Sequence, residues 1–531
     1  MKIKYLILSL ASSFVMSCTS GFEEMNKNPL VVNETTPDLL LPVMEHYGYQ
    51  VGNGEYQRAN LLYSALYCQY VANVSANFTS GNYLYNSSWA ERGFWTPYYQ
   101  KVLKNFREAE KLLASNGQYE DMYQIMRILT ASVTMRQTDV FGDIPYFGAG
   151  YGDTQVVYDS QSVIYDDVFK SLKEAVDLLK QKRKDQSKYG KEDLIYQGNV
   201  DKWIKFGNSL RLRAAIRLSY VDQAKAKSEG EAALKELMME SNADNAQVIT
   251  QTIGLNGNPF IQNSYRNEFR ASETMINMLT QNSTVNDPRL PLILGKTQAW
   301  MDGVEGAQEY KGLPNGLATS DVTRPEYDFY HNSPYWGYMW GFTWNDKGFG
   351  GKSAKPNGKI VIPVVIMNYA EVCFLKAEAA LRGWSGAGSA KDNYNAGIQA
   401  SIDEMRTYAP KGSYTTENDM TYCSTGWVKW DAAADFEEAL KRIITQKWIA
   451  VFPNAVEAWA EFRRTGYPEL TPIRYSLEAT IKPENGEFIK KLRYVDNELI
   501  NNGINVNNPN LNGGKGDGVN VRVWWDTGRY K

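Results

Sequence analysis

Histidine is scarce in this chain, since its 531 residues include only His46 and His331. Few histidines are therefore available to act as the general base of a catalytic triad. The sequence also carries no GxSxG, HExxH or P-loop motif. Adjacent carboxylates such as Asp166 and Asp167 fall on a predicted helix, where neighbouring side chains point apart. Catalysis therefore finds little support in the sequence.

Cysteine is equally rare, with Cys18, Cys68, Cys373 and Cys423 as its only occurrences. They form no CxxC pair and no Cys/His cluster, so the sequence predicts no zinc site and no other metal or cofactor. Cys68 and Cys373 fall on apolar helical faces, where a free cysteine behaves as a small hydrophobic residue. We expect both of these to be buried.

A basic surface is also lacking, because 57 Lys and Arg are outnumbered by 60 Asp and Glu. The net charge of −3 argues against a nucleic-acid-binding protein, which usually needs a basic face. After the N-terminus no apolar run approaches the roughly 18–20 residues that a membrane-spanning helix requires. The length of the chain is sufficient for more than one hydrophobic core.

The N-terminus has the layout of a bacterial lipoprotein signal peptide. Two lysines precede the apolar run Tyr5–Met16, and Cys18 follows shortly after it. In this interpretation residues 1–17 are removed and Cys18 is lipidated, so that an acyl anchor holds the protein on a membrane. Ordinary secretory cleavage, with Cys18 left as an incidental thiol, is the alternative. Residues 18–45 are expected to be a lipidated tether and N-terminal arm, followed by one domain over 46–531.

Helical periodicity is strongest in the last third of the chain. Apolar residues recur at helical spacing over Val364–Arg382 and again over Asp435–Phe452, which predicts two packed helices. A third helix is predicted to begin after Asn454, with Glu457 completing a capping box, and to end at Gly466.

The first half of the chain is also predicted to be helical. The expected helices are Leu61–Val74, Trp95–Ala114, Tyr119–Met135, Val163–Lys180 and Asp201–Tyr220, followed by a more polar helix through Glu240. Such consecutive helix pairs are the kind of unit that stacks into a solenoid. The predicted fold class is therefore mostly α, built from stacked helix pairs. Residues 240–360 differ, since they are rich in Gly, Asn, Pro and aromatics, and we expect an irregular insertion that carries ligand-binding loops.

The main candidate binding site is the aromatic block Tyr327–Trp344 within this insertion. We predict ligand contacts from Tyr335, Trp336, Trp340 and Trp344, because exposed aromatic faces stack on sugar rings or peptide side chains. The interleaved glycines would let the loop approach a ligand closely. The alternative is that these aromatic side chains form a small core beneath a long loop.

A second aromatic cluster lies in a polar loop between predicted helices. It contains Phe78, Tyr83, Tyr85 and Trp89, of which the last three are predicted ligand contacts. By contrast, Trp95, Tyr98 and Tyr99 follow helical spacing and are expected in the core.

Two further polar features are interpreted as structural. Asp139 and Asp143 flank a turn and could bind a cation or sugar hydroxyls, although capping and turn formation are favoured. Residues 508–513 begin like a calcium loop, but Val519 stands where a bidentate glutamate would be needed. We expect a turn-rich surface segment there.

Several segments together resemble one known family. They are RQTDVFGDIPYF (136–147), GNVDKWIKFGNSLRLRAAIRLS (198–219), NDPRLP (286–291), NYAEVCFLKAEAA (368–380), DNYNAGIQASI (392–402), ITQKWIAVFPNAVEAWAEFRRTGYP (444–468) and VWWD (523–526). In number and order they resemble the SusD/RagB family of surface lipoproteins of Bacteroidetes, which capture nutrients for an outer-membrane transporter.

The resemblance implies a tetratricopeptide-like helical fold and a non-catalytic binding protein, lipid-anchored on the outer membrane and facing the cell exterior. Its implied partner is a TonB-dependent SusC-like transporter, with a glycan or a peptide as the ligand; the tryptophan-rich block favours a glycan. In starch-binding relatives an aromatic arc draws on a loop near Trp89 and on the mid-chain insertion, which implies Trp89, Trp336 and Trp340 as lead contacts by position only.

Two other functions are compatible with the composition. One is an all-helical glycoside hydrolase or lyase, whose carboxylate pair would come from distant positions. The other is a structural surface lipoprotein whose aromatic side chains serve only as a protein interface. A helical fold by itself does not decide among the three.

Overall fold

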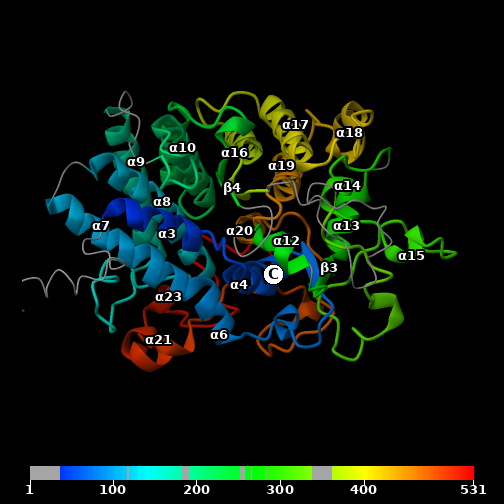
Figure 1. Ribbon diagram of the computed structural model, residues 1–531, viewed down its shortest axis with the longest axis horizontal. Coiled ribbons are helices and arrows are strands. Elements are labelled where there is room, and N and C mark those ends of the chain that lie inside the picture. The colour runs from blue at the N-terminus through cyan, green and yellow to red at the C-terminus, as the bar shows by residue number, and fades with distance from the viewer. Residues whose placement is uncertain are drawn as a thin grey trace, which may run out of the picture.

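The computed structural model describes residues 36–115, 119–181, 190–250, 257–264, 266–282, 284–337 and 362–530. The predicted sites Cys18, Trp340 and Trp344 lie outside these residues. Most of the described chain is helical, with two short two-stranded sheets between the helices (Figure 1). Within it, no helix combines the length and apolar character needed to span a bilayer.

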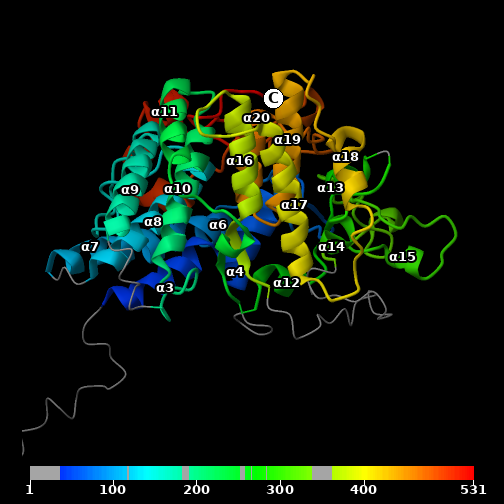
Figure 2. The ribbon, with the colours of Figure 1, turned by 90° about the horizontal axis from the view of Figure 1, so that it is seen from above.

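One group of helices comes from the first half of the chain. Its members are α3 (Pro37–Gly48), α7 (Lys104–Ser115), α8 (Glu120–Phe141), α9 (Gln161–Gln181), α10 (Val200–Arg217) and α11 (Gln223–Leu234). Helix α8 packs on α9, and α10 packs on both α9 and α11, so consecutive helices stack as neighbours (Figure 2). The predicted stacking of helix pairs is confirmed. Helix α3 also joins this group, with Leu41 and Met44 fully buried.

A second group comes from the last third. It contains α16 (Tyr369–Leu381), α17 (Ala390–Tyr408), α18 (Asp419–Ser424), α19 (Phe436–Ala450) and α20 (Ala455–Thr465). Helix α16 packs against α17, α19 and α10, and thereby joins the two groups. Helix α19 begins where predicted because the Asp435 side chain accepts a hydrogen bond from the Glu438 backbone N–H at 2.8 Å.

The predicted helix Val364–Arg382 is wrong at its start. Its first residues form strand β4 (Val364–Met367), which pairs antiparallel with β2 (Ala246–Val248). Three consecutive β-branched residues favour a strand at this point. The helix begins only after Asn368, whose side chain accepts from the Glu371 N–H at 2.9 Å.

The predicted helix Leu61–Val74 is also too long. Regular helix ends with α5 (Ala65–Tyr67), Gln69 adopts a positive φ of 59°, and β1 (Val71–Asn73) follows. Strand β1 pairs antiparallel with β3 (Phe269–Ala271), which lies in the predicted insertion. A partner strand distant in sequence therefore decides the conformation of this segment.

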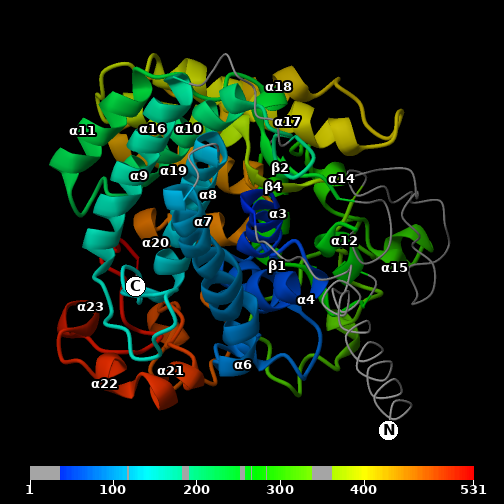
Figure 3. The same cartoon turned by 60° about the vertical axis from the view of Figure 1, so that its left-hand side comes forward.

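Shorter elements fill the remainder. They are α4 (Asn53–Tyr56), α6 (Ser87–Ala90), α12 (Pro259–Ser264), α13 (Glu273–Thr280), α14 (Leu290–Ile293), α15 (Gln298–Met301), α21 (Asp496–Asn501), α22 (Gly503–Val506) and α23 (Leu511–Gly514), with π-helical segments at Gln57–Ser64, Glu91–Trp95 and Pro97–Leu103. Helices α21 to α23 gather at one corner of the molecule and α15 lies on the opposite side (Figures 1 and 3).

The two helix groups share a buried network of charges. Its members are Arg213 and Arg217 of α10, Glu371 and Glu378 of α16, Lys447 of α19, and Glu457, Glu461 and Arg464 of α20. Every one of these side chains is buried. Because each charge has several opposite partners, the cost of removing it from water is offset by paired hydrogen bonds.

The predicted capping box at α20 is wrong, although the helix begins and ends as expected. The Asn454 side chain makes no cap bond; it accepts from Arg136 Nη1 at 3.1 Å and donates to the Ile366 carbonyl at 3.0 Å. Glu457 instead joins the charge network. Both side chains that the local pattern assigned to the cap instead bond to residues from other parts of the fold.

Candidate functional site

The two aromatic clusters found in the sequence meet at the small sheet β1–β3. Asn73 lies opposite Phe269 and Ala72 lies opposite Arg270 in this sheet. Because successive side chains of a strand point to opposite faces, Phe269 and Arg270 lie on different sides. Each side collects one set of aromatic rings.

On the first side, Phe269 joins both clusters. The Phe78 ring stacks on Phe269, with centroids 5.7 Å apart, and meets the edge of Trp89 at 5.9 Å. On its other flank Phe269 contacts Tyr335 at 6.3 Å. The structure therefore brings Trp89 and Tyr335 onto one continuous aromatic cluster, and Trp89 remains half-buried at its edge.

On the second side, Arg270 lies between two aromatic rings. Its guanidinium carbon is 4.4 Å from the Phe329 ring centroid and 5.7 Å from that of Trp336, and Nη1 donates to the Phe269 carbonyl at 2.8 Å. Arg270 is completely buried, and burial lowers its pKa to about 9. Phe329 covers this cation while remaining 44% exposed, so its outer face is open to a ligand.

The predicted contacts fall into different environments. Tyr83, Tyr335 and Trp336 are 2%, 0% and 2% exposed, so protein already covers both faces of these rings. This burial favours the alternative of a small core over direct ligand contact. Tyr85 is half-buried and donates from its hydroxyl to the Arg493 carbonyl at 2.9 Å.

Exposed aromatic rings do occur near the sheet, at positions outside the predicted set of ligand contacts. Tyr475 is 49% exposed, and Tyr327 accepts a hydrogen bond from Arg474 Nη1 at 3.0 Å. We refer to these two tyrosines and Phe329, which is two residues from Tyr327, as the aromatic face. Tyr327 and Phe329 belong to the block singled out in the sequence, whereas Tyr475 stands in an irregular segment with no local pattern to mark it.

Asn82 ties the segment that carries Tyr475 to the loop at Leu317. Its side-chain amide donates to the carbonyls of Leu317 and Tyr475, each at 3.0 Å, and its own carbonyl accepts from the Leu477 N–H at 2.7 Å. Asn82 is buried, so these bonds fix the backbone beneath the exposed rings.

One carboxylate near this face, that of Asp328, is already engaged by the backbone. Asp328 Oδ1 accepts from the N–H groups of Tyr330 and His331 at 3.0 and 2.9 Å, and from His331 Nδ1 at 2.8 Å. Such an arrangement stabilises a turn rather than presenting a free base.

Asp139 and Asp143 are likewise structural. Asp139 Oδ1 accepts from Tyr165 Oη at 2.7 Å and Trp525 Nε1 at 2.6 Å, while Asp143 Oδ2 accepts from the Asn512 N–H at 2.7 Å. Asn512 is buried, so the segment 508–513, which was predicted to lie on the surface, belongs in part to the core. Across the described residues no three His, Cys, Asp or Glu side chains converge as metal ligands would.

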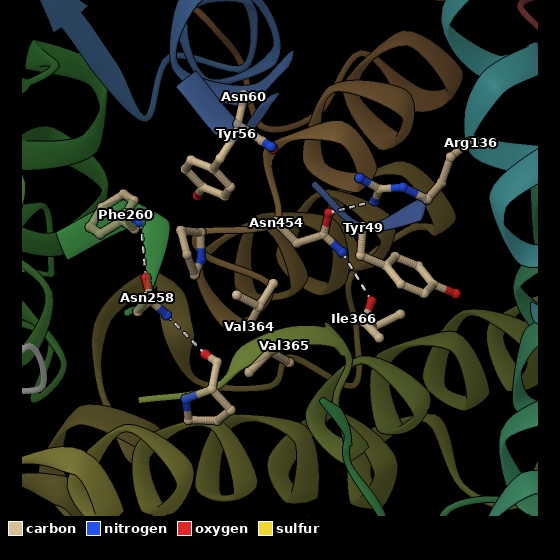
Figure 4. A pocket seen from close by; sticks show the side chains of 12 residues that line it. Tyr49, Tyr56, Asn60, Arg136, Asn258, Phe260, Val364, Val365, Ile366 and Asn454 are labelled. Atoms are coloured by element: carbon tan, nitrogen blue, oxygen red, sulfur yellow. Dashed lines mark hydrogen bonds between the residues drawn. The ribbon is translucent and has the colours of Figure 1, made fainter. Parts of the chain in front are cut away.

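A separate cavity between the two helix groups is too small for a nutrient. It is lined by Tyr49, Tyr56, Arg136, Asn454 and the β4 strand and encloses about 30 Å³ (Figure 4). That volume suits one water molecule. Burial lowers the pKa of Arg136 to about 10, and Figure 4 shows its guanidinium bonded to Asn454.

Comparison with known proteins agrees with this architecture. The family model described as "Susd and RagB outer membrane lipoprotein" matches residues 20–526. The chain belongs to the SusD-like family. The predicted family and the mostly helical fold are therefore confirmed, and the family consists of nutrient-binding outer-membrane lipoproteins that are generally non-catalytic.

Solved SusD-like structures cover almost the whole chain. A chitin-binding SusD homologue from Flavobacterium johnsoniae is 28% identical, with 92% of this chain and 98% of that chain covered and a TM-score of 0.73. A SusD homologue from Bacteroides vulgatus is 26% identical, with 92% and 98% covered and a TM-score of 0.76. Another structure, named as a chitin-binding protein, is 28% identical, covers 93% of this chain and 100% of its own, and has a TM-score of 0.74. No curated protein matches the sequence.

Proposed function

We propose that this SusD-like protein captures a glycan at the cell surface and delivers it to a TonB-dependent SusC-like transporter in the outer membrane. The observation that carries the proposal is the family match over residues 20–526. Capture requires no bond to be broken, in keeping with the turn-forming role of Asp328 beside the aromatic face.

The proposed ligand is an oligosaccharide of the chitin type. Two of the structural relatives, each 28% identical, are named as chitin-binding. The aromatic face offers open rings from Phe329 and Tyr475, which can stack on the C–H faces of sugar rings. Arg474 and the Tyr327 hydroxyl add polar groups that can bond to sugar hydroxyls or acetamido oxygens.

Trp89, Tyr85, Trp340 and Trp344 remain part of this proposal. Trp89 and Tyr85 are half-buried, and Trp89 joins, through Phe78 and Phe269, the side of the β1–β3 sheet opposite Phe329. They would extend the binding surface around the edge of the sheet. Tyr83, Tyr335 and Trp336 would act by supporting the exposed rings from below.

The lipid anchor on Cys18 would hold the protein at the outer membrane, facing the exterior. A Cys18→Ser variant expressed in its native host should move from the membrane fraction to the soluble fraction. Protease treatment of intact cells should degrade the wild-type protein if it faces outward. A Cys18→Ser protein that stays in the membrane fraction would contradict the proposed anchor.

Native affinity electrophoresis of the protein from residue 19 onward tests capture directly. We expect retardation in gels containing a soluble chitin derivative, and no release of reducing sugar. Retardation by a different polysaccharide would retain capture and correct the ligand. Binding of peptides without any glycan would replace the glycan by a peptide, and steady release of reducing sugar would overturn the non-catalytic assignment.

A further inference from the structure

A groove of about 610 Å³ lies away from the aromatic face, between three parts of the chain. Its walls are the π-helical stretch Glu91–Leu103 with the start of α7, the loop 145–156, and helix α21. The volume falls within the range of about 300–1,000 Å³ that is usual for small-molecule sites. Helix α15 lies near the aromatic face, since its Ala299 N–H donates to the Tyr330 carbonyl. Helix α21, which forms one wall of the groove, lies on the other side of the molecule from α15 (Figures 1 and 3).

Hydrogen bonds fix the three walls relative to one another. Tyr99 Oη donates to the Pro145 carbonyl at 2.9 Å, which joins the π-helical stretch to the loop. Asn502 Nδ2 donates to the Val156 carbonyl at 2.8 Å, which joins the loop to the segment after α21. Asn497 donates to Glu91, which joins α21 to the π-helical stretch. A groove that is formed before its ligand arrives loses less entropy on binding.

Tyr151 supplies an aromatic platform at the rim of the groove. Its ring lies 5.1 Å from the Arg107 guanidinium, which is itself fixed by a bond from Nη2 to the Tyr146 carbonyl at 3.1 Å. Tyr151 is 54% exposed, so one ring face is held by the cation and the other is open. Trp95 and Tyr99 also line the groove, with ring centroids 4.7 Å apart, but Trp95 is buried and Tyr99 half-buried, so Tyr151 supplies the open ring.

Polar groups in the groove define the ligand chemistry. Gln100, Asn497 and Asn501 present amides that can both donate to and accept from hydroxyl groups. The lining carboxylates are those of Glu91, Glu108, Asp153 and Glu498, against only two ammonium groups from Lys104 and Lys111. An excess of negative charge disfavours uronate, sulfate or phosphate groups.

We propose that this groove is a second saccharide-binding site, which takes a short oligosaccharide made of neutral or amino sugars. The open face of Tyr151, flanked by amides and carboxylates, matches a molecule with apolar C–H faces and a rim of hydroxyls. π-helical segments of the kind that forms one wall occur frequently at functional sites. The site shares no residue with the aromatic face and does not depend on it.

Isothermal titration with three tetrasaccharides tests the proposal, using a Phe329→Ala/Tyr475→Ala protein to remove the aromatic face. The probes are chitotetraose, its fully deacetylated form and tetragalacturonate. We expect binding of one or both of the first two and none of the acidic probe. Tyr151→Ala added to this background should weaken binding about tenfold. Phe147→Ala is the matched control, since it removes an aromatic ring of the same loop that is 43% exposed and does not line the groove.

Each possible result of the titration either supports or overturns the second saccharide-binding site. No binding of either non-acidic probe up to about 10 mM in the double variant would overturn the second site, while leaving glycan capture by the wild type intact. Binding that survives both Tyr151→Ala and Asn501→Ala would place the ligand elsewhere and equally overturn it. Retained binding in the double variant that Tyr151→Ala abolishes would support the groove even if capture at the aromatic face proved wrong. The melting temperature of each variant checks that the fold is unchanged.

Discussion

Arg213 of α10 and Glu371 of α16 form a bidentate ion pair across 158 positions of sequence. Nη2 lies 2.7 Å from Oε2 and Nε lies 2.8 Å from Oε1, and both side chains are at most 2% exposed. Nearby, Lys447 Nζ lies 3.4 Å from Glu371 Oε1. This pair fixes the first helix group to the last, and so holds the scaffold on which the binding surfaces stand.

Removing one partner of this pair should be strongly destabilising. Glu371→Ala leaves two buried cations short of a counter-ion, and we expect a loss of about 3–5 kcal/mol in the free energy of unfolding. Chemical denaturation followed by circular dichroism measures the change. The control is Glu108→Ala, which breaks an exposed pair with Lys111 and should cost less than about 1 kcal/mol. Equal effects of the two variants would contradict the role assigned to the buried network.

Acid should weaken the same network. Although burial by itself would raise the pKa of Glu457, the charges of Arg217, Lys447 and Arg213 lower that pKa to about 2. The folded protein therefore holds this proton less tightly than the unfolded chain, whose ordinary value is 4.5. The contribution to stability is complete above that value and is lost as the pH falls toward about 2. Thermal unfolding across this range should show a falling melting temperature, with a smaller fall in Glu457→Gln.

Glu404 should show the opposite pH dependence. Burial raises the pKa of Glu404 to about 7, against hydrogen bonds from Asn368 and Asn245 that lower it. Its contribution to stability is complete below the ordinary value of 4.5 and is lost as the pH rises through about 7. Glu404→Gln keeps the acceptor for Asn368 without the charge, so it should stabilise the protein by on the order of 2 kcal/mol near pH 8. It should have little effect near pH 4, a contrast that melting curves at the two values would reveal. A gain of equal size at both would refute this explanation.

Trp336 should matter for folding more than for binding. Because its side chain is 2% exposed and packs near Arg270 and Tyr335, Trp336→Ala should cost about 3–5 kcal/mol of stability. The affinity of the fraction that remains folded should change little. Denaturation curves and titration of the same sample separate the two effects. A stable variant with lost affinity would restore Trp336 as a direct contact.

Much of the helical scaffold could be predicted from sequence because its periodicity is strong and local. The predicted helix Asp435–Phe452 is observed as Phe436–Ala450, and Asp201–Tyr220 as Val200–Arg217. Cys68 and Cys373 are buried as expected. The β4 strand was missed because its β-branched residues merge with the periodicity of α16.

The binding surface was harder to predict because it depends on contacts between distant segments. Trp336 and Tyr335 stand in a glycine-rich aromatic block that looks exposed, yet β3 supplies the partners that bury them. Tyr475 has no aromatic neighbours in sequence, and bonds from Asn82 and from Arg474 to distant segments fix its position near Tyr327. No local pattern carries that information.

Titration of chitotetraose into the wild type and into Phe329→Ala/Tyr475→Ala measures glycan capture at the aromatic face. Both rings are partly exposed, although Phe329 also covers Arg270, so their loss should lower the melting temperature only modestly and weaken binding at the aromatic face by about tenfold or more. Met420→Ala, at a residue that is 84% exposed on α18, is the control and should bind like the wild type. We expect the stronger of the two binding events of the wild type to be lost in the double variant and kept in Met420→Ala, with no sugar cleaved. Unchanged affinity in the double variant, or tetramer converted to shorter sugars, would contradict glycan capture at the aromatic face.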